Sequence, residues 1–567
     1  MREPGLRWRR IRKVKCDEGR PACVRCIKAG RTCEGYGIWS KGSVTSTTSR
    51  KLCPRTHSER LPTSNQGRLR ANTSTKAKAL KSFDQSSIGT SLNQAGSEEM
   101  LGGIMISQTL SDLPQSPAEE RALLAWYFDV TSWKLPGTFP SEFWLALVPQ
   151  ASYSEPAVLY GALAIAAAHR HQSLQSSARE ARVEDRPTLQ AYTKAISYAR
   201  ARLTAGNGSS AKVAMITCVL FVCLDLVQQR CLSAALHLQG GLMIMAKTFR
   251  ESQDNTMDLI EQALLRLSLQ MNHMGPKIVP KLLGFSQTPR TMPAMFHDVV
   301  DARSHLDMIE AQIAELHSAP LYNIDERRER ICEDLRLWLR AYANSRIETN
   351  PNLPERSRGA TIVLRMCYQM TVISTEVCQQ TRSESLYDGH SSRFLCIIND
   401  ATKMWSAVEQ AHLMRGLKFP GDRHASIIDV GWIPATYFVA IRCRVPEIRS
   451  RAVRLLEGTQ HTEGMWNANM CVAVAKEVMR LEGCSAEHER DGAEDLYRPL
   501  KADHLSLPNV PESQRVSNIE MSYVDDTGRT VLLKCVRTHS DGRRGQFIRR
   551  YDAATGCWYG GTARSDV

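Results

Sequence analysis

Apolar residues recur at helical spacing along most of the chain. Between residues 116 and 485 they fall three and four positions apart in one segment after another, which is the spacing of one face of an α-helix. The clearest such segments are residues 191–203, 296–318 and 446–458, whereas 157–174 is rich in Ala and Leu and 213–227 is apolar almost throughout. A regular two-residue alternation, which would indicate strands, does not interrupt them. The pattern therefore predicts a mostly α fold with a large all-α domain over 116–485.

The segment before this domain has a different composition. Residues 38–115 are rich in Ser, Thr, Gln, Asn and Gly, with few aromatic residues. Such a segment buries too little apolar surface to offset its ordering entropy, so it is predicted to be a disordered basic and polar linker. Ser116, Pro117 and Glu119 then predict a capping box at the start of the first helix, with Ser116 as N-cap and Pro117 as the first helical residue.

The C-terminal part changes to a strand-like pattern. Residues 515–551 alternate between polar and apolar positions or are rich in β-branched residues, and the sequences Asp-Asp-Thr-Gly and Ser-Asp-Gly-Arg separate them as turns. This pattern predicts a short antiparallel β meander within a β-rich tail, residues 486–567.

The net positive charge of the chain is confined to its N-terminal part. The 567-residue chain has a formal net charge of +14, but its first 80 residues carry +15 and the remaining residues only −1. A uniformly basic globule would imply little, whereas a basic arm is typical of a segment that binds a polyanion such as nucleic acid.

The cysteines and the apolar runs indicate where in the cell the protein is expected. Four of the 17 cysteines cluster near the N-terminus and the others are scattered singly. No signal-peptide pattern opens the chain, so the scattered thiols indicate reduced intracellular cysteines. The longest apolar run, 213–227, contains Asp225 and is shorter than the roughly 20 residues that span a bilayer. We expect a core helix in a soluble, intracellular protein that does not enter a membrane.

The clustered cysteines have the spacing of a metal site. Cys16, Cys23, Cys26 and Cys33 form the pattern C-x6-C-x2-C-x6-C. Zinc takes four ligands in a tetrahedron, thiolates at C-x2-C spacing fold the backbone around one ion, and the neighbouring Lys and Arg residues favour the thiolate form. An isolated C-x2-C pair could be incidental or redox-active. Four cysteines within 18 residues instead indicate Zn(2+) as a cofactor, with these four residues as metal ligands.

The segment from Arg10 to Tyr36 resembles the fungal zinc binuclear cluster, the Zn2Cys6 DNA-binding domain of fungal transcription regulators. The family's basic run around its second and third cysteines is matched by Arg10, Ile11, Arg12, Lys13, Val14, Lys15, Cys16 and Asp17. The positions that follow are matched by Pro21, Cys23, Cys26, Gly30, Cys33 and Tyr36. The resemblance implies a DNA-binding domain over residues 1–37, which is incomplete because two of the family's cysteines are missing.

Two cysteines of the family pattern have no counterpart here. Counting back from Cys16, the family's first two cysteines would stand at Arg9 and Leu6. In the family six thiolates hold two zinc ions and two of the thiolates bridge them. By that mapping Cys23 is the remaining bridge, and neither ion keeps four ligands. Three explanations fit: a wrongly assigned N-terminus that omits an exon, a rearrangement of four cysteines around one zinc ion, or a decayed cluster.

The resemblance also implies how DNA would be read. Arg12 and Lys13 stand where family members contact base edges of a CGG-type triplet, and guanine O6 and N7 accept hydrogen bonds from such side chains. Arg10 and Lys15 stand where phosphates are contacted. The same basic run is typical of a nuclear-import signal, which is compatible with DNA binding. Sustained heptads are lacking in residues 41–115, so homodimerisation stays open.

Residues 116–485 resemble the regulatory region of fungal-specific transcription factors. The resemblance is carried by residues 155–171 and 437–467 and implies an inhibitory or ligand-responsive domain, with a small-molecule effector or a co-regulator as partner. We therefore expect a nuclear zinc-cluster transcription factor that binds double-stranded DNA and regulates a set of genes, as in a metabolic or biosynthetic pathway. The alternative is a regulatory interaction protein with a degenerate zinc cluster that no longer reads DNA directly.

An enzyme is not indicated. His169 and His171 are two positions apart and so face different sides of a helix, which argues against a shared metal. Residues 206–210 lack the Lys-Ser/Thr pair of a phosphate-binding loop and predict a turn between helices. Hydrolase, metalloprotease and dinucleotide-binding motifs are missing from the sequence. Three aromatic residues are interpreted as core rather than as a cofactor site: Trp432, Tyr437 and Trp466.

Overall fold

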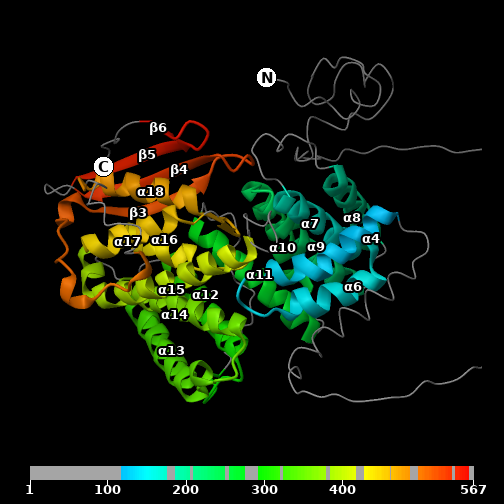
Figure 1. Cartoon of the computed structure of the whole chain (residues 1–567), viewed down its shortest axis with the longest axis horizontal. Helices are drawn as coiled ribbons and strands as arrows, with labels where there is room; N and C mark the ends of the chain where they lie inside the picture. Colours follow the sequence, from blue (N-terminus) through cyan, green and yellow to red (C-terminus); the bar gives the residue numbers. More distant parts are fainter. Residues whose placement is uncertain are drawn as a thin grey trace, which may run out of the picture. The chain divides into compact units, whose positions relative to one another are not determined.

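A computed structural model describes most of the helical and strand-forming part of the chain. The described residues are 117–174, 186–204, 208–248, 255–274, 291–318, 323–378, 383–416, 427–459, 461–484, 496–538 and 543–560. They all belong to one compact unit, Ser91–Val567. They form a mostly helical structure with a small antiparallel sheet near the C-terminus, as the sequence predicted (Figure 1). The predicted zinc cluster and linker lie outside the described residues.

The first group of helices packs around one almost wholly apolar helix. In chain order the elements are α4 (Ala118–Trp126), η1 (Tyr127–Thr131), α5 (Ser132–Lys134), η2 (Phe143–Leu147), α6 (Val148–Ser154), α7 (Pro156–Leu174), α8 (Arg186–Thr204), α9 (Gly208–Val227), α10 (Cys231–Thr248) and α11 (Asn255–Met274). Helix α9 contacts α7, α8, α10 and α11. Gly161 allows the close approach of α7 to α9, because a Cβ at this position would lie 2.9 Å from Leu220 Cδ1.

Helix α9 contains the apolar run 213–227, which was predicted to be a core helix. In the described part of the chain, Ser210–Val227 is the one stretch long and apolar enough to cross a bilayer by length and composition. The fold buries 83% of this window among other helices, as expected for a core helix.

The second group of helices carries the sheet. Its elements are α12 (Val299–Ser318), α13 (Ile324–Ser345), η4 (Ile347–Thr349), α14 (Glu355–Glu376), η5 (Glu384–His390), α15 (Ser391–Gly416), α16 (Ile433–Arg442), α17 (Pro446–Glu457), the hairpin β1 (Thr462–Glu463) and β2 (Trp466–Asn467), α18 (Ala468–Leu481), η7 (Ala502–His504) and η8 (Glu512–Gln514). Helix α12 contacts α13 and α14, α14 contacts α15 and α16, and α16 contacts α17 and α18.

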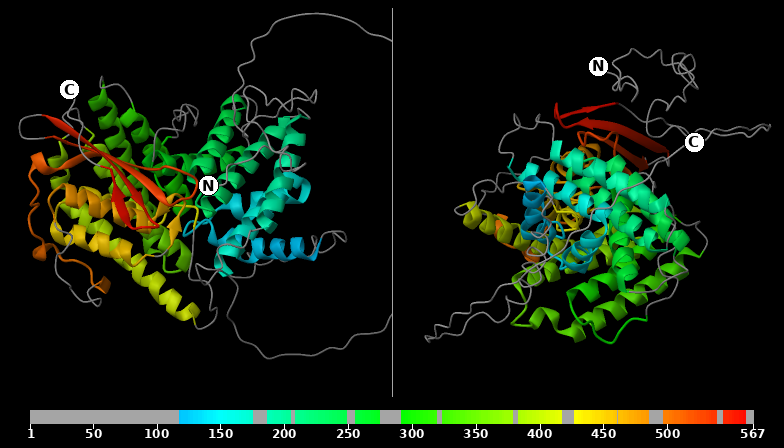
Figure 2. Two further views of the ribbon diagram at one scale, coloured as in Figure 1. Left: turned by 90° about the horizontal axis from the view of Figure 1, so that it is seen from above. Right: turned by 90° about the vertical axis from the view of Figure 1, so that its right-hand side faces the viewer.

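The C-terminal strands form the predicted meander. Strands β3 (Val516–Tyr523), β4 (Thr530–Thr538), β5 (Arg544–Asp552) and β6 (Cys557–Tyr559) pair antiparallel in sequence order. The sheet lies against the helices rather than apart from them, and Figure 2 shows it in red over them. Residues of β3 and β4 are buried in the same apolar core as the helices: Val516, Met521, Tyr523, Val531, Leu533 and Cys535.

The predicted capping box at the first helix is wrong. Helix α4 begins at Ala118, with Pro117 as its N-cap residue and no side-chain capping hydrogen bond. Pro117 has an extended backbone, with φ −52° and ψ 145°, so the helix begins one residue later than predicted. Glu119 consequently occupies the second helical position, where it cannot complete the box.

Candidate functional site

The zinc and DNA sites predicted from the sequence cannot be placed. The predicted zinc ligands Cys16, Cys23, Cys26 and Cys33 and the predicted DNA contacts Arg10, Arg12, Lys13 and Lys15 all lie outside the described residues. Their roles stay predictions. Among the residues that the structure does describe, no group of three or more His, Cys, Asp or Glu side chains could hold a metal ion.

His169 and the three aromatic residues singled out in the sequence are buried, whereas His171 is half-buried. His169 is in the core, with Nδ1 3.0 Å from Thr131 Oγ1 and its ring against the edge of Trp126. Trp432, Tyr437 and Trp466 are buried as predicted. However, Tyr437 and Trp466 also line a cavity, which their apolar surroundings in the sequence do not indicate.

Two cavities share a wall formed by helix α11. The larger has a volume of about 570 Å³ and lies between η2, α11 and the start of α12. The smaller, here called the aromatic cavity, has a volume of about 340 Å³ and is lined by residues of α11, α12, α14, η5, α16, β2 and β3. Arg266 and Gln270 of α11 line both cavities.

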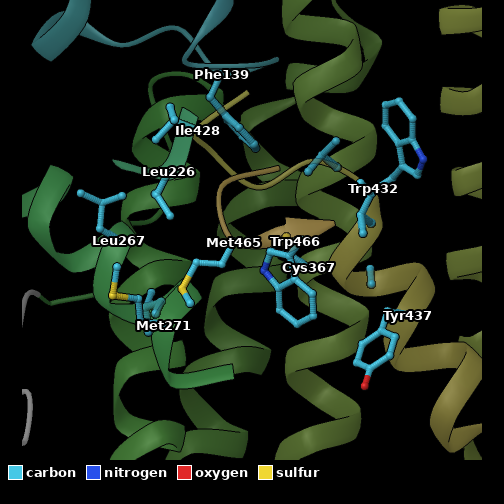
Figure 3. Close-up of a cluster of buried hydrophobic side chains, with 14 of the residues drawn as sticks. Phe139, Leu226, Leu267, Met271, Cys367, Ile428, Trp432, Tyr437, Met465 and Trp466 are labelled. Carbon is cyan, nitrogen blue, oxygen red and sulfur yellow. The ribbon is translucent and has the colours of Figure 1, made fainter. Parts of the chain in front are cut away.

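The walls of the aromatic cavity are largely apolar. They include Ile313, Met370, Tyr437, Phe438, Trp466 and Met521, which come from five different elements. The ring centroids of Tyr437 and Trp466 are 5.7 Å apart, within the range of favourable aromatic pairs. Figure 3 shows Trp466 extending from its strand toward the helix that carries Cys367, with Tyr437 nearby on α16.

One end of the aromatic cavity is polar because Arg266 and Arg303 line it, and both arginines belong to a cluster of four charged residues. This arginine–aspartate cluster consists of Arg266, Arg303, Asp307 and Asp429. Asp307 accepts hydrogen bonds from Nε of Arg303 at 2.5 Å and from Nε of Arg266 at 2.9 Å. Asp429 lies 3.7 Å from Nη2 of Arg303 and 3.9 Å from Nη1 of Arg266. The two aspartates balance the two arginines, so the cluster joins α11, α12 and the segment before α16 without net charge.

Two polar atoms of this cluster and one of the neighbouring Gln270 are buried and unpaired in the described part of the chain. Nη1 of Arg303, Nη2 of Arg266 and Oε1 of Gln270 have no hydrogen-bond partner among the described residues. A buried polar group without a partner costs about 1–3 kcal/mol, and native proteins contain few of them. Here the three residues that carry these atoms all line the aromatic cavity.

Glu310 adds a titratable group to this end of the cavity. It lies seven residues after Arg303 on α12, and its Oε1 accepts a hydrogen bond from Thr371 Oγ1 of α14 at 3.0 Å. Burial, and then the charge of Asp307, raise the pKa of Glu310 to about 7, although Arg303 and the Thr371 hydrogen bond oppose the rise. Its carboxyl group therefore changes charge near neutral pH.

A second buried carboxylate holds the hairpin that carries Trp466. Glu463 accepts backbone hydrogen bonds from Gly431, Trp432 and Ile433 at 2.9, 3.1 and 3.0 Å, at the start of α16. A carboxylate at a helix N-terminus satisfies otherwise unpaired N–H groups and interacts favourably with the helix dipole. Gly464 follows with φ +56°, where a Cβ would also collide with Gln270 Oε1. Trp466 is thereby fixed relative to α16 and α11.

Two segments of the chain match known domain families. Residues 10–43 match the fungal Zn(2)-Cys(6) binuclear cluster domain, which binds zinc. Residues 123–275 match the fungal specific transcription factor domain. The second match includes helix α11, which lines both cavities.

Three curated proteins are similar to parts of the chain. The aspercryptin biosynthesis cluster-specific transcription regulator atnN of Emericella nidulans is 26% identical over 352 residues, which are 58% of this chain and 52% of that protein. Transcription regulator lscL of Purpureocillium lilacinum is 70% identical over 27 residues, 5% of this chain and 6% of lscL. An uncharacterised transcriptional regulatory protein of Schizosaccharomyces pombe is 49% identical over 43 residues, 8% of each chain.

These similarities are partial. The chain spans about half the length of the first relative and less than a tenth of the other two. No solved structure matches the chain.

Proposed function

We propose that the chain is a fungal Zn2Cys6 transcription regulator, as its two domain matches and its similarity to atnN support, and that it acts in the nucleus and binds CGG-type triplets in double-stranded DNA through its basic, cysteine-rich N-terminal segment. The observation that carries the proposal is the occurrence in one chain of both matches, the zinc-cluster domain at 10–43 and the transcription factor domain at 123–275. The charge distribution supports it, because the first 80 residues hold all of the net positive charge.

The four cysteines of the N-terminal segment suit one zinc ion. Cys16, Cys23, Cys26 and Cys33 provide four thiolates, which is a complete tetrahedral set for a single ion. A two-ion cluster requires six, and Leu6 and Arg9 cannot supply the other two. Zinc would stiffen a segment too short to bury a core, so that Arg12 and Lys13 are held for base contacts.

The regulated genes are proposed from the first relative. The printed name of atnN describes a regulator specific to one biosynthesis cluster. The alignment with atnN over 58% of this chain supports a role in controlling a metabolic or biosynthetic pathway. The alternative function, a regulatory interaction protein with a degenerate cluster, is favoured by the residues Leu6 and Arg9 at the two cysteine positions.

The two kinds of proposed DNA contact predict different mutant phenotypes. Arg12→Ala or Lys13→Ala should weaken the free energy of binding to a duplex with a CGG triplet by about 1–3 kcal/mol. The loss on a scrambled duplex should be much smaller, because base contacts distinguish one sequence from another. Arg10→Ala or Lys15→Ala should weaken binding to both duplexes about equally. Each should also lower the magnitude of the slope of log K against log salt concentration by about 1, because every phosphate contact releases counterions.

Fluorescence anisotropy of both duplexes at several salt concentrations checks this prediction. The phosphate-contact variants serve as matched controls for the base-contact variants, since each removes one positive charge from the same basic run. An Arg12→Ala variant that loses the same affinity for both duplexes would argue for the alternative function.

A further inference from the structure

We propose that the aromatic cavity binds a small, ring-containing apolar molecule that presents a carbonyl or carboxylate oxygen to the end formed by Arg303 and Glu310. The inference deepens the proposed function, on which it rests, because it names the chemical class of the effector and places it at a defined site in the regulatory part of the chain.

The size and walls of the cavity suit such a molecule. A volume of about 340 Å³ lies within the range of ligand sites, which are about 300–1,000 Å³, mostly apolar, and polar at a few points. Tyr437, Phe438 and Trp466 supply aromatic surface, and Ile313 and Met370 supply aliphatic surface. A flat ring system would contact these side chains without burying its own polar atoms against them.

The polar end calls for an acceptor atom. Arg303 is only 2% exposed, lines the cavity, and has an Nη1 group without a hydrogen-bond partner in the described part of the chain. Arg266 has a similar unpaired Nη2 group. A guanidinium can only donate hydrogen bonds, so its complement is an oxygen acceptor. Asp307 and Asp429 already balance both arginine charges, so a neutral carbonyl compound is as suitable as a carboxylate.

Glu310 allows the polar end to bind either a carbonyl or a carboxylate oxygen. When protonated, its carboxyl group can donate a hydrogen bond to a ligand oxygen, and its pKa of about 7 makes that form accessible at neutral pH. A cationic ligand would instead require the ionised form. The other titratable or charged groups that act on Glu310 come from three places, namely Asp307 and Arg303 on α12, Cys367 on α14 and Asp429 before α16.

The position of the cavity connects occupancy to the regulatory domain. Its walls join α11, the last helix in the segment that matches the transcription factor domain, to α16, β2 and β3. A molecule in this cavity would contact all of these elements at once. Binding would therefore stabilise the arrangement of α11 against the second group of helices and the sheet.

Three naphthalene probes with one ring system and different head groups test the proposal on the full chain. They are 2-naphthoate, 2-naphthamide and 2-naphthylmethylammonium, titrated by isothermal calorimetry at pH 6 and pH 8. We expect the carboxylate and the amide to bind at one site per chain, at least tenfold more tightly than the ammonium probe at pH 6. Naphthoate affinity should fall about tenfold between pH 6 and pH 8, since a pKa near 7 leaves about a tenth of Glu310 protonated at pH 8, and Glu310→Gln should remove that dependence.

A matched pair of variants locates the binding. Ala314 lines the cavity and Ala201 is exposed on α8. Ala314→Phe should fill the cavity and weaken naphthoate binding at least tenfold, whereas Ala201→Phe should leave it unchanged. A thermal melt verifies that each variant is folded, and Met370→Trp fills the same cavity from α14 if Ala314→Phe loses its cooperative melt.

Several results would overturn the proposal. They are the absence of binding by both oxygen probes, equal or tighter binding of the ammonium probe, and unchanged naphthoate affinity in a folded cavity-filling variant. Probe binding does not involve DNA, so its failure is distinct from failure of the proposed function, which appears as loss of triplet selection by the same protein.

Discussion

Replacing Cys23 by serine is expected to remove zinc from the N-terminal segment and to reduce affinity for a CGG duplex to the level of an unrelated duplex. A serine hydroxyl does not ionise at neutral pH, so the ion would keep three of its four proposed ligands. The segment depends on metal for its folding free energy, and its base contacts would be lost with the metal. Specific binding typically exceeds non-specific binding by about 10³-fold or more, which sets the size of the expected loss.

Zinc content per purified chain and binding to two duplexes measure this effect. The wild-type chain should hold one zinc ion and Cys23→Ser none. Cys53→Ser is the matched control, because it removes a thiol from the same basic part of the chain but outside the motif. If Cys23→Ser and Cys53→Ser had the same zinc content and the same duplex preference, the four-cysteine site would be refuted.

Replacing Glu482 by glutamine is expected to lower the free energy of unfolding by about 3–5 kcal/mol, because it leaves the buried Arg449 without its carboxylate partner and Arg444 with Glu384 alone. Glu482 Oε1 accepts hydrogen bonds from Arg444 Nη2 at 2.7 Å and from Val516 N at 3.0 Å. Its Oε2 accepts from Arg449 Nη1 at 2.7 Å. The side chains of Glu482 and Arg444 are fully buried, and that of Arg449 is nearly so. The carboxylate thus joins α17 and the end of α18 to β3.

The same substitution should change the pH dependence of stability. Burial alone would raise the pKa of Glu482, but Arg449 and Arg444, with the Val516 N–H, lower it below the ordinary glutamate value of 4.5. Because the pKa of Glu482 is lower in the folded state than in the unfolded state, its carboxylate stabilises the fold above about pH 4.5. This stabilisation is lost as the pH falls through the folded-state pKa. The difference between wild type and Glu482→Gln should therefore shrink in acid.

Guanidinium denaturation of the full chain at neutral and acidic pH, followed by circular dichroism, measures both effects. Glu457→Gln is the matched control, because Glu457 pairs with Lys476 at 2.6 Å at the surface, where such pairs contribute about 0–1 kcal/mol. Equal denaturation midpoints for Glu482→Gln and Glu457→Gln would show that the buried ion pairs of Glu482 contribute no more to stability than the surface pair of Glu457.

The elements of the fold could largely be predicted from local patterns. The Ala/Leu-rich segment 157–174 predicted helix α7 to within one residue, and the apolar run 213–227 predicted α9 except for its first five residues, because both helices are buried against their neighbours. The alternation and turn sequences of 515–551 likewise predicted the meander. The helix start at Pro117 was missed by one residue, since capping depends on backbone angles that a sequence pattern does not specify.

The cavity and its polar end could not be predicted in this way. Arg303 and Glu310 have the spacing of ordinary surface charges on a helix, and only the approach of Asp429, more than a hundred residues later, and of Thr371 reveals their burial. Trp466 was correctly expected in the core, but its place on a cavity wall depends on the hairpin that Glu463 holds against α16. Contacts between distant segments carry this information, and one sequence does not contain a signal for them.

Selection of duplexes from a random pool by the full chain, with zinc bound and after its removal by a chelator, tests the central claim most directly. Our account predicts that the zinc-bound protein enriches duplexes with a CGG-type triplet, that the chelated protein enriches none, and that added zinc restores the enrichment. A zinc-bound protein that retains every sequence equally would contradict it.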